Sequence, residues 1–282
     1  MKIIRTIADL RAELAPSRKT GQSIGLVPTM GFFHEGHRSL MVRSTASCDV
    51  TVVTLFVNPT QFNDARDLEA YPRDEKKDAA IAEDAGVDYL FAPDAREMYS
   101  AGHSTVVSVK GLTESLEGAA RGTGHFDGVA TVVAKLFNIA QPDVAFFGQK
   151  DAQQALVVKK MVRDLDLPIR IEVCPTVREA DGLAMSSRNV RLKPEERAKA
   201  LVLRAGLNAV LAAITAGERR ASAIEAAGRA AMEAMGVKPE YLAARAAGTL
   251  LPMSELRGEV LIAVAARVGE VRLIDNEFVS IE

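Results

Sequence analysis

The sequence predicts an α/β protein in which a doubly wound parallel sheet is followed by a second, smaller α+β domain. Between residues 23 and 173, short apolar runs alternate with longer segments of helical character, which is the pattern of a parallel sheet with crossover helices. From residue 194 the alternation stops, and an alanine-rich stretch precedes two strand-like runs. Three polar segments directly follow apolar runs. They are therefore expected at the carboxyl edge of the sheet, where such folds bind ligands.

The first half of the sheet is expected to contain three strands, at residues 23–27, 50–57 and 88–93. The second of these runs is almost entirely β-branched, which suits a strand buried on both faces. Because Pro59 cannot continue a central strand, residues 58–62 are expected to form a loop. One helix is expected to begin near residues 39–43. Another covers residues 74–85, with Gly86 as its C-terminal cap.

The second half of the sheet is expected to add strands at residues 105–109, 143–148 and 169–173. The first of these would be an extra strand, and the second stops at Gly148. Helices are expected over residues 129–140 and 151–165, and Asp151 is placed to cap the second helix.

The last third of the chain predicts a separate domain. Residues 194–235 are alanine-rich and helical, and Pro194-Glu195-Glu196 is a typical helix start. Strands are expected over residues 260–268 and 271–274, with a break at Gly269. The domain boundary is therefore placed near residue 176, which gives domains over residues 1–176 and 177–282.

The composition is that of a globular protein with a small net charge. The 282 residues are 48% hydrophobic and 26% charged, with a net charge of −2 and a pI of about 6.2, which argues against a nucleic-acid partner. No apolar run approaches the roughly 20 residues of a membrane helix, and the N-terminus lacks the apolar core of a signal peptide. Cys48 and Cys174 lie far apart, so no disulfide framework is expected. A cytoplasmic location is expected.

The most informative segment runs from Pro28 to His37 and carries two of the four histidines, His34 and His37. It joins a predicted strand to a predicted helix, where N–H groups and the helix dipole favour phosphate. Residues three apart on a helix share a face, so both imidazoles can donate protons to polyphosphate oxygens. The spacing resembles the His-x-x-His signature of the nucleotidyl-transferase superfamily. A satisfied helix cap and half of a zinc site are the alternatives, the second disfavoured because neither cysteine has a local Cys or His partner.

A second strand-to-helix junction lies at residues 147–154. Gly148 lets the backbone approach a ligand, Lys150 can place a positive charge on phosphate, and Gln154 is expected to point toward the same cleft. A solvated helix cap is the alternative for the Lys150-Asp151 pair.

Two further loops carry candidate binding groups. In residues 182–189, two serines precede Arg188, whose guanidinium can bind phosphate through two hydrogen bonds, although such runs are common in surface loops. In residues 56–62, the amides of Asn58 and Gln61 can hold hydroxyl or carboxylate groups. Hydrogen bonding within the loop is the alternative there.

Taken together and in this order, the four segments resemble those of the pantothenate synthetase family, the pantoate–β-alanine ligases. The resemblance runs from Pro28 to Arg191 and resumes at residues 265–269 and 272–276. It implies a Rossmann-like first domain and a C-terminal lid domain in a cytoplasmic homodimer that uses ATP and Mg²⁺. It also implies that the carboxylate of pantoate attacks the α-phosphate of ATP and releases pyrophosphate. The amine of β-alanine then attacks pantoyl adenylate, which gives pantothenate and AMP.

The same resemblance implies roles for individual residues. His37 would be the proton donor, and the other catalytic groups would be His34, Lys150 and Arg188. The ATP-binding residues would be Met30, Gly31, Phe32, Phe33, His34, Glu35, Gly36, His37, Gly148, Gln149, Lys150, Asp151, Val177, Met185, Ser186, Ser187 and Arg188. Pantoate would contact Gln61, Phe62, Val132, Val133 and Gln154, and β-alanine would contact Gln61. Asp78 is the candidate for a carboxylate near Mg²⁺.

Three segments depart from the family's wording. Phe32-Phe33 replaces a smaller pair, and residues 121–126 carry an extra residue, so Arg121 is given no role. Residues 243–248 are alanine-rich where the family is more polar. His103 and His125 are also left without a role. Two other functions compete with the ligase: another adenylyl-transferring enzyme of the same superfamily, and a catalytically silent nucleotide-binding module. A tRNA synthetase would need a basic tRNA-binding region, which the sequence does not show, and a silent module would be expected to lack the phosphate-handling residues.

Overall fold

The computed structural model describes the backbone of residues 1–282 and every side chain except that of Thr123. The chain divides into two compact units. Unit 1 contains Met1–Gln149 and Gln153–Pro175, and unit 2 contains Lys150–Ala152 and Thr176–Glu282. The boundary inferred from the sequence lies between residues 176 and 177. Nothing in the sequence indicated that three residues after the fifth strand would group with unit 2.

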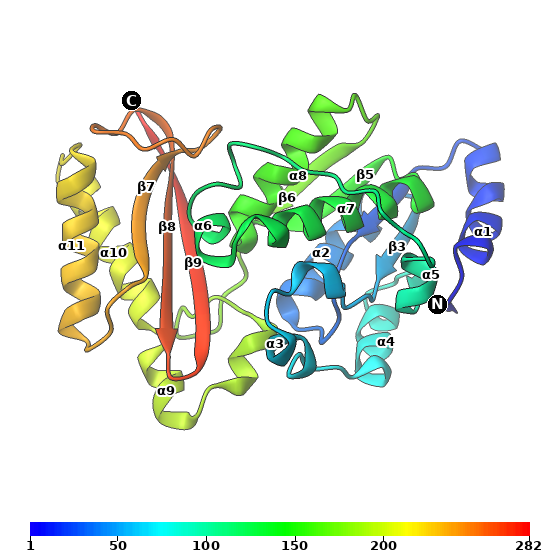
Figure 1. The fold of residues 1–282 in the computed structure, drawn as a ribbon, viewed down its shortest axis with the longest axis horizontal. Coiled ribbons are helices and arrows are strands. Elements are labelled where there is room, and N and C mark those ends of the chain that lie inside the picture. Colours follow the sequence, from blue (N-terminus) through cyan, green and yellow to red (C-terminus); the bar gives the residue numbers. More distant parts are fainter. The chain divides into compact units, whose positions relative to one another are not determined.

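Unit 1 is built on a six-stranded parallel sheet, which confirms the predicted fold class (Figure 1). The strands are β1 (Lys2–Ile4), β2 (Ile24–Val27), β3 (Val50–Thr54), β4 (Tyr89–Phe91), β5 (Val144–Gly148) and β6 (Arg170–Cys174). Their order is β1-β4-β3-β2-β5-β6. From β2 the chain first adds strands on one side, then returns to place β5 on the other side. The order therefore reverses between β2 and β5, and the carboxyl ends of these two strands form the switch point at which open α/β sheets bind ligands.

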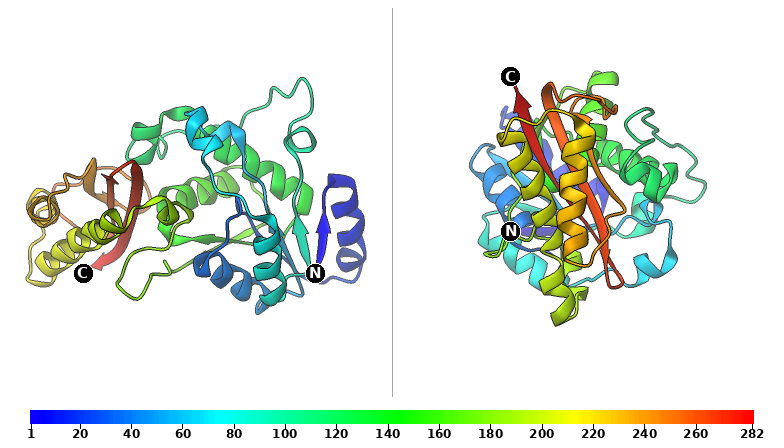
Figure 2. Two further views of the ribbon diagram at one scale, coloured as in Figure 1. Left: turned by 90° about the horizontal axis from the view of Figure 1, so that it is seen from below. Right: turned by 90° about the vertical axis from the view of Figure 1, so that its left-hand side faces the viewer.

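Helices cover both faces of this sheet. Helix α7 (Thr123–Ala140) packs against α1 (Ile7–Lys19), and α2 (Glu35–Thr45) packs on β2, β3 and β5 and against α4 (Glu75–Asp84). The left-hand view of Figure 2 shows α7 on one face of the sheet and α2 and α4 on the other. The remaining helical elements of unit 1 are η1 (Pro59–Gln61), α3 (Ala65–Glu69), α5 (Ala95–Met98), α6 (Glu117–Arg121) and α8 (Ala152–Asp164). The short helix η2 (Gln149–Asp151) begins in unit 1, and its last two residues belong to unit 2.

The packing of α2 places the first polar segment on a rigid support. Leu40 and Met41 of this helix are buried in a core with Val53, Leu90 and Phe146. A buried core side chain typically adds a few kcal/mol of stability, about 1.5–3 kcal/mol for Leu or Met. The amino end of α2 is therefore held at the end of β2 by the core beneath it.

One strand prediction is wrong, and several elements were not predicted, among them the first strand, the first helix and the strand at Tyr241–Ala246. Residues 105–109, all of them described, form no strand, because the N–H of Val107 donates to Thr131 Oγ1 on α7 (2.9 Å) instead of to a neighbouring strand. Val106 is 60% exposed, so the apolar run is not buried as a unit. Strand β1 and helix α1 were not expected: β1 is only three residues long, and α1 contains Pro16, which normally argues against a helix interior.

Unit 2 contains a three-stranded antiparallel sheet covered by helices. Its strands are β7 (Tyr241–Ala246), β8 (Gly258–Val268) and β9 (Val271–Ile281), in the order β7-β8-β9. Its helical elements are η3 (Ser187–Arg191), α9 (Pro194–Lys199), α10 (Val202–Thr215) and α11 (Ala221–Ala234). The right-hand view of Figure 2 shows α10 and α11 side by side on one face of the sheet. This arrangement confirms the predicted smaller α+β unit.

Two glycines allow α10 and α11 to approach each other closely. A Cβ atom at Gly206 would lie 2.8 Å from Met232 Sδ, and one at Gly228 would lie 2.7 Å from Val210 Cγ2. Such contacts are far inside normal packing distances, so the helix pair needs glycine at these positions.

The stretch Pro194–Thr215 is long and apolar enough, by length and composition, to cross a membrane, contrary to the expectation from the sequence. In the structure it is divided into α9 and α10, and 39% of its most apolar 18-residue stretch is buried. The face of α10 that carries Leu203, Leu207 and Val210 is packed in the core of unit 2. Core packing accounts for the apolar residues on this face of the helix.

Candidate active site

The loop after β2 is hydrogen-bonded to β3 and to the residues after β3, at a point before the two histidines. The N–H of Thr29 donates to Thr54 Oγ1 (3.1 Å), and the N–H of Phe56 donates to the Thr29 carbonyl oxygen (3.2 Å). The segment from Met30 to His37 therefore leaves the sheet from a fixed point at the carboxyl end of β2.

A buried carboxylate holds the turn that follows. Both Gly31 (φ 86°) and Phe32 (φ 54°) have left-handed backbone conformations, which is unfavourable for a side chain as large as phenylalanine. Asp78 on α4 compensates, because its Oδ2 accepts the N–H of Phe32 (2.7 Å) and its Oδ1 accepts the N–H of Phe33 (2.6 Å). A Cβ atom at residue 31 would lie 3.0 Å from Asp78 Oδ2, so this approach requires glycine.

In the structure Asp78 serves as the acceptor that holds this turn, whereas the sequence suggested it as a carboxylate near Mg²⁺. Its side chain is only 1% exposed, and each oxygen is already bonded to a backbone N–H. Burial raises the pKa of Asp78, and the two N–H donors act in the opposite direction. A metal ion bound by this carboxylate would compete with the bonds that define the turn.

His34 and His37 form a capping box at the start of α2. The Nδ1 atom of His34 accepts the N–H of Gly36 (3.1 Å), and the Nδ1 atom of His37 accepts the N–H of His34 (3.3 Å). Because Nδ1 accepts in each neutral ring, the ring proton lies on Nε2. The ring centroids are 4.1 Å apart. The structure thus combines the two interpretations offered by the sequence: the histidines cap the helix, and capping orients two Nε2–H donors at its amino end.

Gln61 in η1 is held by a network centred on Asn58. Asn58 is 1% exposed, and its Nδ2 donates to Gln61 Oε1 (3.1 Å), while its Oδ1 accepts the hydroxyl of Tyr99 (2.8 Å). His125 Nδ1 lies 2.8 Å from the Gln61 carbonyl oxygen. The amide of Gln61 therefore has a defined orientation, with Nε2 directed to Met30 Sδ at 3.0 Å.

Helix α7 supports η1 at close range. A Cβ atom at Gly128 would lie 2.5 Å from the Thr60 carbonyl oxygen, so the helix backbone itself is in contact with the loop. Val132 and Val133 on the same helix are buried, and Phe62 packs edge-on against Tyr71, with ring centroids 5.7 Å apart. The structure brings Met30 and Gln61 into contact, and it places Phe62 and both valines on the elements around them.

Gln154, the other candidate for pantoate, lies in the first turn of α8. No pattern in the sequence singled out its neighbour Gln153, which is buried and accepts the N–H of Glu117 through Oε1 (2.9 Å). Its Nε2 donates to the carbonyl oxygen of Leu112 (2.6 Å). Gln153 thus anchors the loop before α6. Arg121 of that helix is paired with Glu117, with 2.9 Å between Nε and Oε2.

The predicted ATP-binding residues of unit 2 lie on two segments. Lys150 and Asp151 follow β5, with 3.5 Å between Nζ and Oδ1. On the second segment, the N–H of Met185 donates to the Val177 carbonyl oxygen (3.0 Å), which closes a hairpin over residues 177–185. Ser186 then caps η3, because its Oγ accepts the N–H of Arg188 (3.2 Å).

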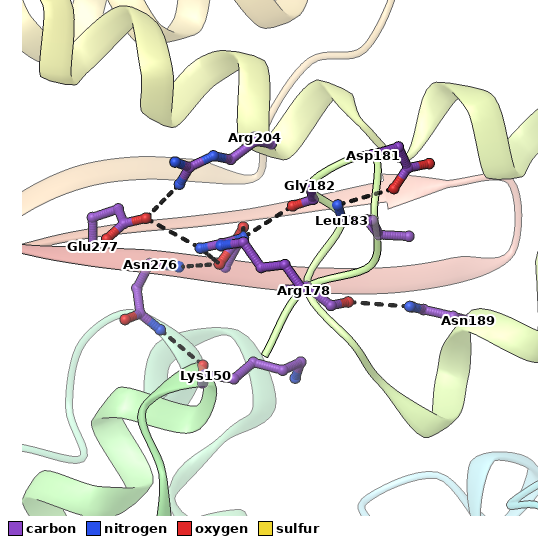
Figure 3. A network of polar contacts seen from close by, with 11 residues as sticks. Lys150, Arg178, Asp181, Gly182, Leu183, Asn189, Arg204, Asn276 and Glu277 are labelled. Atoms are coloured by element: carbon purple, nitrogen blue, oxygen red, sulfur yellow. Dashed lines mark hydrogen bonds and ion pairs between the residues drawn. The ribbon is translucent and has the colours of Figure 1, made fainter. Parts of the chain in front are cut away.

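An ion-pair network underlies both segments (Figure 3). Arg178 makes two bonds to Asp275 on β9, from Nη1 to Oδ2 (2.6 Å) and from Nη2 to Oδ1 (3.0 Å), and a third to Glu277 Oε1 (3.2 Å). Burial acts to lower the pKa of Arg178, but these bonds outweigh it and raise the pKa. Asn276, between the two acids, donates from Nδ2 to the Lys150 carbonyl oxygen (2.8 Å).

No metal or thiol centre emerges from the part of the chain that the structure describes. Within it, no three His, Cys, Asp or Glu side chains gather into a group that would hold a metal ion. Cys48 and Cys174 are free thiols, and burial raises the pKa of both.

Comparisons of the sequence and the structure with known proteins all indicate one family, over nearly the whole chain. A family model described as pantoate-beta-alanine ligase matches residues 2–278. The pantothenate synthetase of Moorella thermoacetica is 53% identical over 280 residues, covering 98% of each chain. The crystal structure of pantothenate synthetase from Thermus thermophilus is 46% identical with a TM-score of 0.93, covering 98% of this chain and 99% of that chain. The pantoate-beta-alanine ligase of Francisella tularensis, complexed with beta-gamma ATP and beta-alanine, is 32% identical with a TM-score of 0.77, covering 98% of this chain and 97% of that chain.

Proposed function

The chain belongs to the pantoate–β-alanine ligase family, and from this premise we propose how its residues carry out the reaction. It is an ATP-dependent ligase that makes pantothenate from pantoate and β-alanine. We propose that the reaction passes through pantoyl adenylate. A carboxylate oxygen of pantoate bonds to the α-phosphorus as pyrophosphate leaves. The β-alanine nitrogen then bonds to the acyl carbon as AMP leaves, and the proton lost by the amine passes to the released phosphate or to water.

The first step needs positioning and charge neutralisation more than covalent help. His34 and His37 supply two Nε2–H donors at the amino end of α2, where the helix dipole also favours negative charge. We assign His37 the donor role that the resemblance implies, as the donor of a hydrogen bond from Nε2–H to the phosphate oxygens on which charge develops. Lys150 and Arg188 add positive charge for the phosphates, and the remaining ATP-binding residues are those inferred from the sequence: Met30, Gly31, Phe32, Phe33, Glu35, Gly36, Gly148, Gln149, Asp151, Val177, Met185, Ser186 and Ser187.

Gln61 is the best-supported ligand for the acid substrate. Its Nε2 is directed to the sulfur of Met30, which is a weak acceptor. A carboxylate or hydroxyl oxygen of pantoate would replace that sulfur as a stronger acceptor. In this proposal Gln154 also binds pantoate, whose methyl groups contact Phe62, Val132 and Val133. Gln61 additionally contacts β-alanine.

Mg²⁺ is proposed to enter as part of the substrate MgATP. The described residues offer no preformed cluster of metal ligands, and both oxygens of Asp78 are bonded to backbone N–H groups. Mg²⁺ at nucleotide sites commonly takes phosphate oxygens and waters as most of its ligands. No step in this proposal depends on a protein-bound metal.

The remaining proposals concern assembly and location. We propose that the protein is a cytoplasmic homodimer whose substrates are the small molecules ATP, pantoate and β-alanine, without a nucleic-acid or membrane partner. The net charge of −2 supports the absence of nucleic acid. Unit 2 is proposed to act as a lid, since an acyl adenylate must be protected from water.

The pair of Nε2–H donors at the end of β2 is the observation on which this function chiefly rests, and a product assay tests it. With MgATP, pantoate and β-alanine, the protein is expected to form one AMP for each pantothenate. Neither product should appear when any one substrate is omitted. Formation of ADP instead of AMP would contradict the adenylate route, and ATP binding without product would support a catalytically silent module.

A further inference from the structure

We propose that Arg178, Asp275 and Asn276 form a positioning network that presets the nucleotide-binding segments of unit 2. The inference rests on the proposed function, because it concerns the segments that carry Lys150 and Arg188. None of the three residues is assigned to contact a substrate. Their proposed contribution is to hold the main chain on which the phosphate-binding side chains stand.

The centre of the network is a buried ion pair. Asp275 is 3% exposed, and the planar guanidinium of Arg178 binds both of its oxygens. A two-point contact of this kind fixes orientation as well as distance. Asp275 Oδ1 also accepts the N–H of Asn276 (2.8 Å), so the orientation of the carboxylate is tied to the backbone of β9.

The network reaches the lysine segment through Asn276. This side chain is 3% exposed and donates to the Lys150 carbonyl oxygen at 2.8 Å (Figure 3). The bond acts on the backbone of Lys150 and leaves its ammonium group available for other contacts. The bond agrees with the grouping of Lys150–Ala152 with unit 2.

Arg178 connects the same centre to the second segment. Its Nη1 donates to the Gly182 carbonyl oxygen (3.2 Å), and residue 178 pairs with Ala184 across the hairpin. The hairpin ends where Met185 bonds to Val177, directly before the Ser186–Arg188 run. The guanidinium of Arg178 therefore bonds both to the hairpin turn that precedes Arg188 and to the carboxylate of Asp275, which is next to Asn276.

The outer part of the network has a different role. Glu277 bonds to both Arg178 and Arg204. The two arginines are therefore matched by two carboxylates, those of Asp275 and Glu277. It touches neither the Lys150 backbone nor the hairpin turn in the contacts that define the network. Its loss is expected to affect the phosphate-binding segments less than the loss of Asn276.

Asn276→Ala tests the proposal, because it removes the bond to Lys150 and leaves the Arg178–Asp275 pair in place. We expect the KM and the Kd for MgATP to rise by about three- to tenfold, the effect of losing one hydrogen bond, and kcat to fall. The KM for pantoate is expected to stay within about twofold of the parent, because the Asn58–Gln61 network is untouched. Arg178→Lys, which keeps the charge but loses the two-point contact, is expected to act in the same direction.

Glu240→Gln is the matched control. It removes ion pairs that lie outside the network, from Glu240, directly before β7, to Arg272 Nε (2.7 Å) and Arg267 Nε (3.3 Å). It should leave the Kd for MgATP within about twofold of the parent. A folded Asn276→Ala protein with parental affinity for MgATP and parental kcat would overturn the proposal. A uniform change in all kinetic constants would also overturn it, since that would indicate a general loss of structure.

Direct measurement of MgATP binding separates this inference from the proposed function. A parent protein that binds MgATP but makes no pantothenate would refute the function while the Asn276 comparison remained valid. An active parent with an unaltered Asn276→Ala variant would refute only the network.

Discussion

Replacing His37 with alanine is expected to lower kcat by about 10²–10³-fold, the usual cost of removing one donor to a developing negative charge. The protein should still fold, because α2 is anchored by Leu40 and Met41 in the core of unit 1. The measurement is steady-state formation of AMP, with thermal unfolding as the test of folding. Near-normal turnover would contradict the role assigned to His37.

A second substitution separates catalysis from helix capping. In His37→Asn the side-chain oxygen can still accept the N–H of His34, as Nδ1 does now, but the Nε2–H donor is lost. We expect near-parental stability with a rate as low as that of the alanine variant. His103→Ala is the matched control: this histidine is exposed and packs edge-on against Tyr99, so kcat should stay within about twofold.

The second large effect is expected at Asp78. Asp78→Ala leaves the N–H groups of Phe32 and Phe33 without their acceptors, and unsatisfied buried donors cost about 1–3 kcal/mol each. We expect a loss of about 2–5 kcal/mol of unfolding free energy and a fall in kcat comparable to that of the histidine variants, because the left-handed turn before His34 is no longer held. Denaturant unfolding and steady-state kinetics measure the two effects.

The dependence of rate on Mg²⁺ distinguishes a positioning role from a metal-ligand role. Asp78→Asn retains the shape and one acceptor oxygen, so more of the protein should remain folded than with alanine. We expect its half-saturating Mg²⁺ concentration to equal that of the parent while kcat falls. A large increase in that concentration, with kcat restored at high Mg²⁺, would instead identify Asp78 as a metal ligand. Asp84→Asn, which removes an exposed pair with Arg38, should change neither quantity.

The sheet could be predicted because its signals are local. The β-branched run at residues 50–57 and the apolar runs that stop at Val27 and Gly148 identify buried parallel strands without reference to distant residues. The run at residues 105–109 has the same local signal, but Thr131 supplies the bonding partner of Val107, so no strand forms. That choice depends on a side chain more than twenty positions away, which the pattern of residues does not reveal.

In the candidate site, too, the features with local sequence patterns could be predicted, and those that depend on distant residues could not. The spacing of His34 and His37 is a local pattern, which in the structure places one histidine at the N-cap of α2 and the other in its first turn, so both could be singled out. The partners that orient the site are distant in sequence: Asp78 lies 45 residues from Phe33, and Asn276 lies 126 residues from Lys150. The segment at residues 272–276 was recognised as a family resemblance, but only the folded chain shows what Asn276 contacts.

The central claim is that the chain activates pantoate as an adenylate, and exchange of labelled pyrophosphate into ATP tests it most directly. The experiment uses the intact protein with MgATP and pantoate, and without β-alanine. We predict exchange that requires pantoate and is lost in His37→Ala, because pyrophosphate reverses only an adenylate-forming step. Absence of exchange from a protein that binds MgATP and pantoate would contradict the adenylate mechanism.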